Sequence, residues 1–321
     1  MNLQTKIPLE KRSNHLLDYH SSVLLLGSCF VENIGNKLNY FKFNNLQNPF
    51  GILFHPKAIE SFIYNAINQK EYKEKDIFFL NEQWHCFEAH SKLSHTSKDV
   101  LLNDLNSNIK LTNEHIATAT HIIITLGTAW AYKHLETDKT VANCHKVPQK
   151  QFAKELFSID AIYKSLKRII DLIRNINSKS TIIFTVSPVR HLKDGFTQNT
   201  LSKSHLISAI HQLINSELLT GNNQLFYFPS YEIMLDELRD YRFYTEDMLH
   251  PNQVAIDYIW EKFVHVWMSN TCLKTMAEVD AIQKGLRHKP FNPNSEAHLK
   301  FLEQLELKTA KLQAKFPSIT F

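Results

Sequence analysis

Two short segments far apart in the chain carry residue types that together perform nucleophilic catalysis. Gly27 and Ser28 follow the apolar run 22–26 and precede a helical pattern, and Asp247 lies three residues before His250. A serine hydroxyl is a weak nucleophile until a base removes its proton, and an imidazole base works best when a carboxylate fixes its tautomer. These side chains predict a serine hydrolase with Ser28 as nucleophile, His250 as general base and Asp247 as its partner.

Each of these residues also has a purely structural interpretation. A serine at a helix start is often an N-cap, Asp247 could cap the turn before Pro251, and His250 could bond only a carbonyl group. Cys29 adjoins Ser28 and is a second candidate nucleophile. We expect Cys29 to be buried, because a small apolar side chain one residue into a helix usually points into the core. The i, i+3 spacing favours catalysis, since it lets the carboxylate reach Nδ1 while Nε2 faces the serine.

Short apolar runs, too continuous for half-exposed strands, alternate with helical periodicity along the chain. The runs cover residues 22–27, 121–127, 180–187 and 224–228. The helical patterns cover residues 31–39, 56–68, 161–177, 202–219 and 254–268. Such runs are typical of a parallel sheet buried on both faces, and strand–helix repetition implies right-handed crossovers. We therefore predict an α/β fold, a three-layer α/β/α sandwich with a parallel sheet.

Three segments depart from this alternation. Residues 78–94 alternate like a strand or hairpin, and residues 130–147 indicate a second hairpin that turns at 136–139. Both inserted hairpins should leave the region where strands end, so they could form a wall or lid over a site. The last segment, 296–315, is an amphipathic helix suited to packing or oligomerisation. We predict a hydrolase domain over residues 1–271 and a C-terminal helical extension over 272–321.

The glycines indicate where the site lies. The chain has only seven, and three of them, Gly27, Gly51 and Gly127, lie where the first elements of the sheet should end or turn. Ligands of open α/β sheets bind outside the carboxyl ends of the strands. Ordinary strand-to-helix turns explain any one of these glycines equally well, but they explain the three together less well.

Composition bounds the class of protein. Of 321 residues, 43% are hydrophobic and 21% charged, which is ordinary for a globular protein. The net charge of +4 is small and its lysines are scattered, so we expect no nucleic-acid partner. No apolar run is long enough to span a membrane, and residues 1–20 lack the apolar core of a signal peptide, so we expect a cytoplasmic protein. The four cysteines have no framework spacing, which favours free thiols.

Several motifs together resemble the GSCFA domain family. The matching segments are Gly27-Ser28-Cys29-Phe30-Val31, Asn48-Pro49-Phe50-Gly51-Ile52, Leu126-Gly127-Thr128-Ala129-Trp130, Val141–Pro148, Ser187-Pro188-Val189-Arg190 and Phe243–Pro251. The family resembles the SGNH hydrolases, and this resemblance implies a flavodoxin-like fold and ester hydrolysis. It also implies Ser28 as nucleophile, His250 as base and Asp247 as its partner, with the backbone N–H of Gly51 donating to the oxyanion.

One departure from the SGNH pattern concerns the oxyanion. In SGNH enzymes an asparagine after the third strand donates to it, whereas this chain has Ala129 at that place. Asn143, which follows the second hairpin, is our candidate replacement, and Thr128 is the reserve. The N–H of Ser28 would be a further donor.

Other polar and aromatic residues should surround the substrate. We expect His90 and Trp84 to line a substrate wall, and His55 and His145 to lie near Gly51 and Asn143. Arg190 follows the apolar run 180–187 and could clamp an anionic group of the substrate or form a surface ion pair.

A metal site and a cofactor are not expected. His85, Cys86, His90 and His95 are residue types that bind zinc, but their spacing matches no standard pattern, and in an alternating strand they face opposite sides. The sequence therefore predicts a metal-free and cofactor-free hydrolase of carboxylic esters. Its substrate should be a small-molecule or carbohydrate ester, with a deacetylase as the favoured form. The alternatives are an acyltransferase on the same scaffold and a non-catalytic carbohydrate- or peptide-binding module.

Overall fold

A sheet of five parallel strands forms the centre of the protein. The computed structural model describes residues 5–221 and 224–321. The strand order is β10-β9-β5-β1-β2, which is the flavodoxin-like order. The strands are β1 (Ser22–Gly27), β2 (Asn44–Gln47), β5 (His121–Leu126), β9 (Thr181–Val186) and β10 (Leu225–Phe228). The predicted α/β/α sandwich with a parallel sheet is confirmed.

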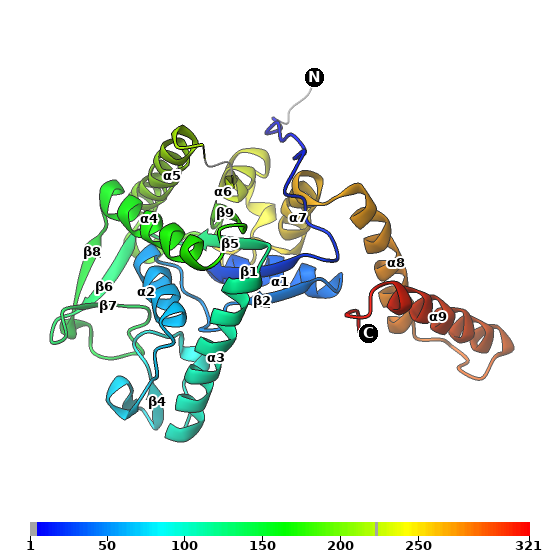
Figure 1. Cartoon of the computed structure of the whole chain (residues 1–321), viewed down its shortest axis with the longest axis horizontal. Coiled ribbons are helices and arrows are strands. Elements are labelled where there is room, and N and C mark those ends of the chain that lie inside the picture. Colours follow the sequence, from blue (N-terminus) through cyan, green and yellow to red (C-terminus); the bar gives the residue numbers. More distant parts are fainter. Residues whose placement is uncertain (1–4, 222–223) are drawn as a thin grey trace.

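Helices cover both faces of this sheet (Figure 1). One face packs against α2 (Pro56–Ile67), α3 (Lys98–Thr118), α4 (Ile159–Ile176) and α5 (Phe196–Leu219). The other face packs against α1 (Cys29–Tyr40) and α7 (Gln253–Trp267). Leu24 and Leu26 of β1 belong to the first of these two cores, and Val23 and Leu25 belong to the second. Successive residues of a strand point to opposite faces, so a strand buried on both sides must be apolar throughout.

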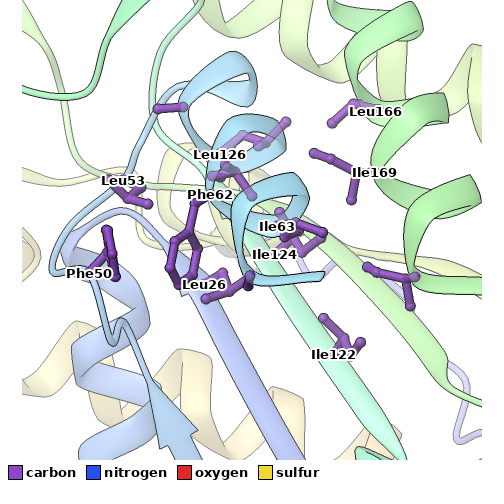
Figure 2. Close-up of a cluster of buried hydrophobic side chains, with 14 of the residues drawn as sticks. Leu26, Phe50, Leu53, Phe62, Ile63, Ile122, Ile124, Leu126, Leu166 and Ile169 are labelled. Atoms are coloured by element: carbon purple, nitrogen blue, oxygen red, sulfur yellow. The ribbon is translucent and has the colours of Figure 1, made fainter. Parts of the chain in front are cut away.

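The first core lies directly below the edge of the sheet where the strands end. Figure 2 shows Leu26, Ile124 and Leu126 from the sheet between Phe50, Phe62 and other side chains of the first core. The rings of Phe50 and Phe62 lie 4.5 Å apart. This packing fixes the loop that carries Phe50 and Gly51 against the end of β1.

The two inserted hairpins form as the sequence predicts. The first has β3 (Phe78–Leu80) and β4 (Gln83–His85), and the second has β6 (Trp130–His134) and β7 (Lys139–Val141). The second gains a third strand, β8 (Phe152–Leu156), which the sequence analysis did not anticipate. It also missed β2, a short polar edge strand, and α3, whose buried residues recur only about every fourth position among polar ones.

Short helices complete the elements that the structure describes. They are η1 (Glu74–Asp76), η2 (Ser91–Leu93), η3 (Gln149–Gln151), η4 (Leu192–Asp194), α6 (Ser230–Glu232), η5 (Ile233–Glu237) and η6 (Tyr241–Phe243). At the C-terminal end, α8 (Asn270–Arg287) and α9 (Glu296–Lys315) pack against each other and extend beyond the sheet (Figure 1). Both helices contribute to the second core. The predicted boundary at residue 271, like oligomerisation through these helices, stays a prediction.

The turn after β1 depends on the absence of a side chain at Gly27. Its φ is +138°, and a Cβ there would lie 2.1 Å from the carbonyl oxygen of Thr125 on the neighbouring strand β5. Backbone cannot retreat as a flexible side chain can, so only glycine fits this close approach.

We predict that Gly27→Ala destabilises the fold by about 3 kcal/mol or more, since it combines backbone strain with overpacking against a buried strand. Urea unfolding measures the difference. Gly221→Ala is the matched control, because Gly221 also has positive φ (+82°) but open space around its Cβ position. A Gly27→Ala protein as stable as this control would contradict the close packing of β1 on β5.

Candidate functional site

Ser28 lies at the start of α1, where it is buried and acts as the N-cap. Its side chain is only 1% exposed, and its hydroxyl oxygen accepts a hydrogen bond from the N–H of Phe30 at 3.3 Å. Its own N–H donates to the carbonyl oxygen of Thr125 at 3.0 Å, which extends the ladder between β1 and β5 by one residue. Both the N–H and the hydroxyl of Ser28 therefore take part in hydrogen bonds of the fold.

Cys29 is the first residue of α1 and, contrary to the expectation of burial, is partly exposed. Burial and the carboxylate of Glu32 raise the pKa of its thiol, while Lys203 and the N–H groups of Cys29 and Phe30 lower it. The first N–H groups of a helix have no acceptor within the helix and stabilise negative charge. Burial outweighs these groups, so the pKa of the Cys29 thiol is raised and the thiol is neutral at rest.

Asp247 and His250 form a hydrogen-bonded pair, with Asp247 Oδ2 2.6 Å from His250 Nδ1. The other carboxylate oxygen accepts hydrogen bonds from the N–H of Leu249 (2.8 Å), the N–H of His250 (3.0 Å) and the hydroxyl of Thr245 (2.7 Å). The N–H of His250, the Thr245 hydroxyl, the N–H of Leu249 and the His250 side chain hold the pKa of Asp247 well below its usual range. The ionised carboxylate fixes the imidazole through Nδ1 and leaves Nε2 available to act on a substrate.

The loop of this pair is held at the carboxyl edge of the sheet. The carbonyl oxygen of Leu249 accepts the N–H of Arg190, which follows β9, at 3.2 Å. Tyr244 and Pro251 form an isolated antiparallel bridge that closes the loop. Helix α7 begins two residues after Pro251 and packs against α1. The pair and Cys29 therefore lie at the N-terminal ends of neighbouring helices.

The structure does not link Ser28 directly to His250. The Ser28 hydroxyl bonds Phe30, and among the described residues no hydrogen bond joins it to the imidazole. The predicted contact between Ser28 and His250 stays a prediction.

The predicted oxyanion donors are engaged within their own loops. The N–H of Gly51 donates to the carbonyl oxygen of Asn48 at 2.7 Å. Asn143 accepts the N–H of His145 at 2.8 Å through its side-chain oxygen. The hydroxyl of Thr128 lies 2.9 Å from that of Ser202 and accepts the N–H of Trp130. The amide of Asn143 keeps a donor that these contacts do not use, whereas the hydroxyl proton of Thr128 is free only if Ser202 donates to Thr128.

Among the predicted substrate-wall residues, only His90 contacts the turn that holds Gly51. Its Cβ lies 2.5 Å from the position of a Cβ on Gly51, and the neighbouring Lys92 bonds Glu32 of α1 at 2.5 Å. Trp84 instead packs against Phe79 and Lys98, away from the Asp247–His250 pair.

His55 and His145 are buried structural groups. His55 caps α2 by accepting the N–H of Lys57, and burial lowers its pKa to about 3. His145 donates from Nε2 to the carbonyl oxygens of Cys86 (2.7 Å) and Ala89 (3.1 Å), and burial lowers its pKa to about 4. His145 therefore ties the loop at residues 86–89 to Asn143.

Arg190 lines a cavity of about 450 Å³ beside the Asp247–His250 loop. Its guanidinium lies 4.3 Å from the ring centre of Tyr244 and 5.2 Å from that of Tyr241. The cavity also has Asp236, Arg239 and Asp240 in its walls. Its combination of aromatic rings with paired charges suits a polar ligand.

Two buried basic side chains at this edge were missed by the sequence analysis. Lys203 is 1% exposed and donates from Nζ to the carbonyl oxygens of Gly127 and Ser187, both at 2.7 Å. Burial lowers its pKa to about 7. His191 is largely enclosed, and its buried Nε2 has no hydrogen-bond partner. Burial, Lys203 and His250 lower the pKa of His191 to about 3. The position of Lys203 on the buried side of a helical pattern was the available signal.

Within residues 5–221 and 224–321, no group of three or more histidine, cysteine, aspartate or glutamate side chains is arranged to hold a metal ion. In the same residues, no helix is both long enough and apolar enough to cross a membrane.

The fold and site define an α/β/α protein with an acid–base pair at the carboxyl edge of a parallel sheet. The model of the GSCFA family matches residues 22–263, and that of the GSCFA domain protein, C-terminal domain, matches residues 279–321. The chain therefore belongs to the GSCFA family.

The comparison with solved structures finds a weak likeness to an esterase. One solved structure, an acetyl xylan esterase (Est2A) from the rumen bacterium Butyrivibrio proteoclasticus, aligns with 84% of this chain at 9% identity and a TM-score of 0.38. This chain spans 66% of the length of that esterase. A likeness of this size is too small to support a functional conclusion. No curated protein matches the sequence.

Buried neutral histidines should make the protein sensitive to acid. The folded-state pKa of His145 is about 4 against an ordinary value of 6.5, so the unfolded chain takes up the proton first as pH falls. Stability from this group is full above pH 6.5 and is lost as pH falls towards 4, by on the order of 2 kcal/mol at pH 5.

We predict that His145→Gln, which keeps an N–H donor, loses less stability than the wild type between pH 7 and pH 5. Urea midpoints at the two pH values measure this loss, and His265→Gln at an exposed position is the control. Equal losses in all three proteins would show that His145 is not held neutral.

Proposed function

We propose that the protein hydrolyses carboxylic esters through an acyl-enzyme intermediate. The observation that carries this proposal is the hydrogen-bonded pair of Asp247 and His250 at the carboxyl edge of the sheet, in which Nε2 of the imidazole bonds none of the described residues. In this pair the carboxylate keeps the proton on Nδ1, so Nε2 can accept a proton from a nucleophile. The nucleophile comes from the turn between β1 and α1, where the sequence predicts Ser28.

The reaction follows from these positions. His250 takes the proton of the nucleophile as the nucleophile attacks the ester carbonyl, and then gives it to the leaving alcohol. Water, activated by the same imidazole, releases the acid. Backbone N–H groups at the start of α1 and the amide of Asn143 are the proposed donors to the oxyanion. Each such donor lowers the barrier by about 3 kcal/mol.

The proposed substrate is an acylated sugar or a similar small polar ester. The cavity beside the pair is lined by Tyr241 and Tyr244, whose rings lie against the Arg190 guanidinium, and by two aspartates. Aromatic faces cover the apolar faces of a sugar ring, while charged side chains bond its hydroxyl groups. These features favour a carbohydrate ester over a long-chain lipid ester.

Asp247→Asn should lower kcat/KM on acetylated sugars and short-chain aryl esters by about 10³-fold, because it removes the charge that orients His250. Asparagine keeps an oxygen that accepts the N–H groups of Leu249 and His250, so the thermal unfolding temperature should hardly change. His250→Gln should be at least as impaired. Steady-state kinetics and thermal unfolding of both variants check this.

Glu246→Gln is the matched control, since Glu246 is an exposed carboxylate next to Asp247. If Asp247→Asn turns over esters as fast as this control, His250 is not the base. A wild type that binds sugars but hydrolyses none of the esters is a binding module.

Asn143 has two candidate roles, and two substitutions separate them. If its amide donates to the oxyanion, Asn143→Ala and Asn143→Ser should both lower kcat about 100-fold with a much smaller change in KM. If it only supports its turn, serine should restore activity, because its hydroxyl can accept the N–H of His145 as the asparagine oxygen does.

Measuring kcat, KM and the unfolding temperature of each variant decides between the roles. Thr128→Val is the comparison. Full activity in Asn143→Ala with an inactive Thr128→Val would transfer the role to Thr128.

A further inference from the structure

Two adjacent residues of the β1–α1 turn carry a nucleophilic atom, and their surroundings differ. Ser28 is 1% exposed, its hydroxyl accepts the N–H of Phe30, and its N–H donates to Thr125. Cys29 is partly exposed, and its N–H belongs to the first turn of α1, where a helix has no internal acceptor. Of these two residues, Cys29 combines partial exposure with a backbone N–H that has no acceptor within its helix.

Lys203 lies at the end of β5, close enough to Cys29 for their charges to interact. It lowers the pKa of the Cys29 thiol, and Cys29 raises the pKa of Lys203. Lys203 donates to the carbonyl oxygen of Gly127 and to that of Ser187, which follows β9. An ammonium group has three donors, so one is not used by these two carbonyl groups.

A second buried group faces the same place without a partner. Nε2 of His191 lies 3.3 Å from the position that a Cβ on Gly127 would take, and it makes no hydrogen bond. An unpaired buried polar atom is costly, and use in a reaction is one explanation for it. The Nε2 of His191 and the Lys203 donor left by the two carbonyl groups support a polar substrate group at this edge.

The base reaches the same edge through the segment that follows β9. The N–H of Arg190 donates to the carbonyl oxygen of Leu249 at 3.2 Å. The neighbouring His191 lies beside Gly127, and both Lys203 and His250 lower its pKa.

We propose that Cys29, and not Ser28, is the nucleophile of the ester hydrolysis proposed above, on which this inference rests, and that Lys203 positions charge beside it. In the first step the thiol proton passes to Nε2 of His250 and the sulfur bonds the ester carbonyl carbon. The tetrahedral intermediate expels the alcohol, which takes the proton from His250. Water then attacks the thioester while His250 takes its proton, and the thiol leaves with that proton as the acid is released.

Electrostatics agree with this order of events. Burial raises the pKa of the Cys29 thiol, so the thiol is neutral at rest and needs His250 to remove its proton. Lys203 and the N–H groups of Cys29 and Phe30 lower the same pKa, which favours the thiolate as it forms. Ser28 is left as the N-cap that holds these N–H groups in place.

Trapping the acyl group tests the assignment. The wild type, Cys29→Ala, Cys29→Ser and Ser28→Ala are mixed with a short-chain aryl acetate, quenched in acid and weighed intact by mass spectrometry. The wild type and Ser28→Ala should carry one acetyl group that neutral hydroxylamine removes, as it does from a thioester. Cys29→Ala should carry none and lose more than 10³-fold in kcat/KM. Cys144→Ser is the matched control, because Cys144 is the other partly exposed cysteine.

The outcomes separate this inference from the proposed function. An acetyl group that persists in Cys29→Ala, resists hydroxylamine and disappears in Ser28→Ala overturns the assignment to Cys29 and leaves the ester hydrolase proposal intact. Thermal unfolding of Cys29→Ser shows whether a loss of activity reflects a loss of fold.

Alkylation by iodoacetamide gives a readout that does not depend on the substrate. Cys29 should be alkylated faster than Cys144, and His250→Gln should lower the alkylation rate of Cys29 at least tenfold. If the wild type takes up no acetyl group while its Cys29 is still alkylated in this His250-dependent way, the proposal of ester hydrolysis is overturned. That result supports Cys29 as a nucleophile for another acyl donor. Equal alkylation rates with and without His250 overturn both proposals.

Lys203 is tested by the pH profile of the same reaction. In Lys203→Met the midpoint of Cys29 alkylation should move to higher pH, because the thiolate loses a neighbouring positive charge. An unchanged midpoint in a folded Lys203→Met protein overturns the positioning role of Lys203.

Discussion

The pairing of β1 with β5 determines the position of every group at the edge of the sheet. Thr125 approaches Gly27 so closely that no side chain fits there, and its carbonyl oxygen takes the N–H of Ser28. The ladder therefore continues one residue past the strand before the helix starts. Because the N–H of Ser28 is used by the sheet, the first N–H of the turn without an acceptor among the described residues belongs to Cys29. Pairing between two strands thus determines which backbone donor the turn leaves available.

Burial of polar groups at this edge is costly, and the fold offsets the cost with backbone carbonyl groups. Lys203 lies among apolar helices, and two carbonyl oxygens accept hydrogen bonds from its Nζ. Its pKa, lowered to about 7, shows that desolvation outweighs these contacts. A charge that is only partly compensated gains when an anion forms nearby. The same arrangement that weakens the resting fold would therefore stabilise a thiolate or an oxyanion.

Local sequence signals predicted the elements that are buried on both faces and the pair whose residues are close in the chain. The apolar runs at β1, β5, β9 and β10 are unambiguous, since no half-exposed strand is apolar throughout. Asp247 and His250 are three residues apart, so a single turn brings them together. By contrast, β2 is polar because it lies at an edge, and α3 buries only a narrow stripe. Neither segment shows a clear hydrophobic periodicity in the sequence.

The proposed assignment of the nucleophile to Cys29 could not be reached from the sequence, because it depends on contacts with β5 that are about 100 positions away in the chain. Ser28 caps the helix and Cys29 begins it. They are adjacent, but the N–H of Ser28 donates to the sheet and that of Cys29 does not. Lys203 was missed for the same reason. Its side chain points inward because of how α5 is rotated about its axis relative to the sheet, which the sequence does not show. A thiol at the helix start has a physical consequence for the reaction. A thioester is more readily attacked than an oxygen ester, so an acyl group held on sulfur can pass to water or to another hydroxyl group. Which of the two receives it depends on what the cavity beside Arg190 admits to the edge of the sheet.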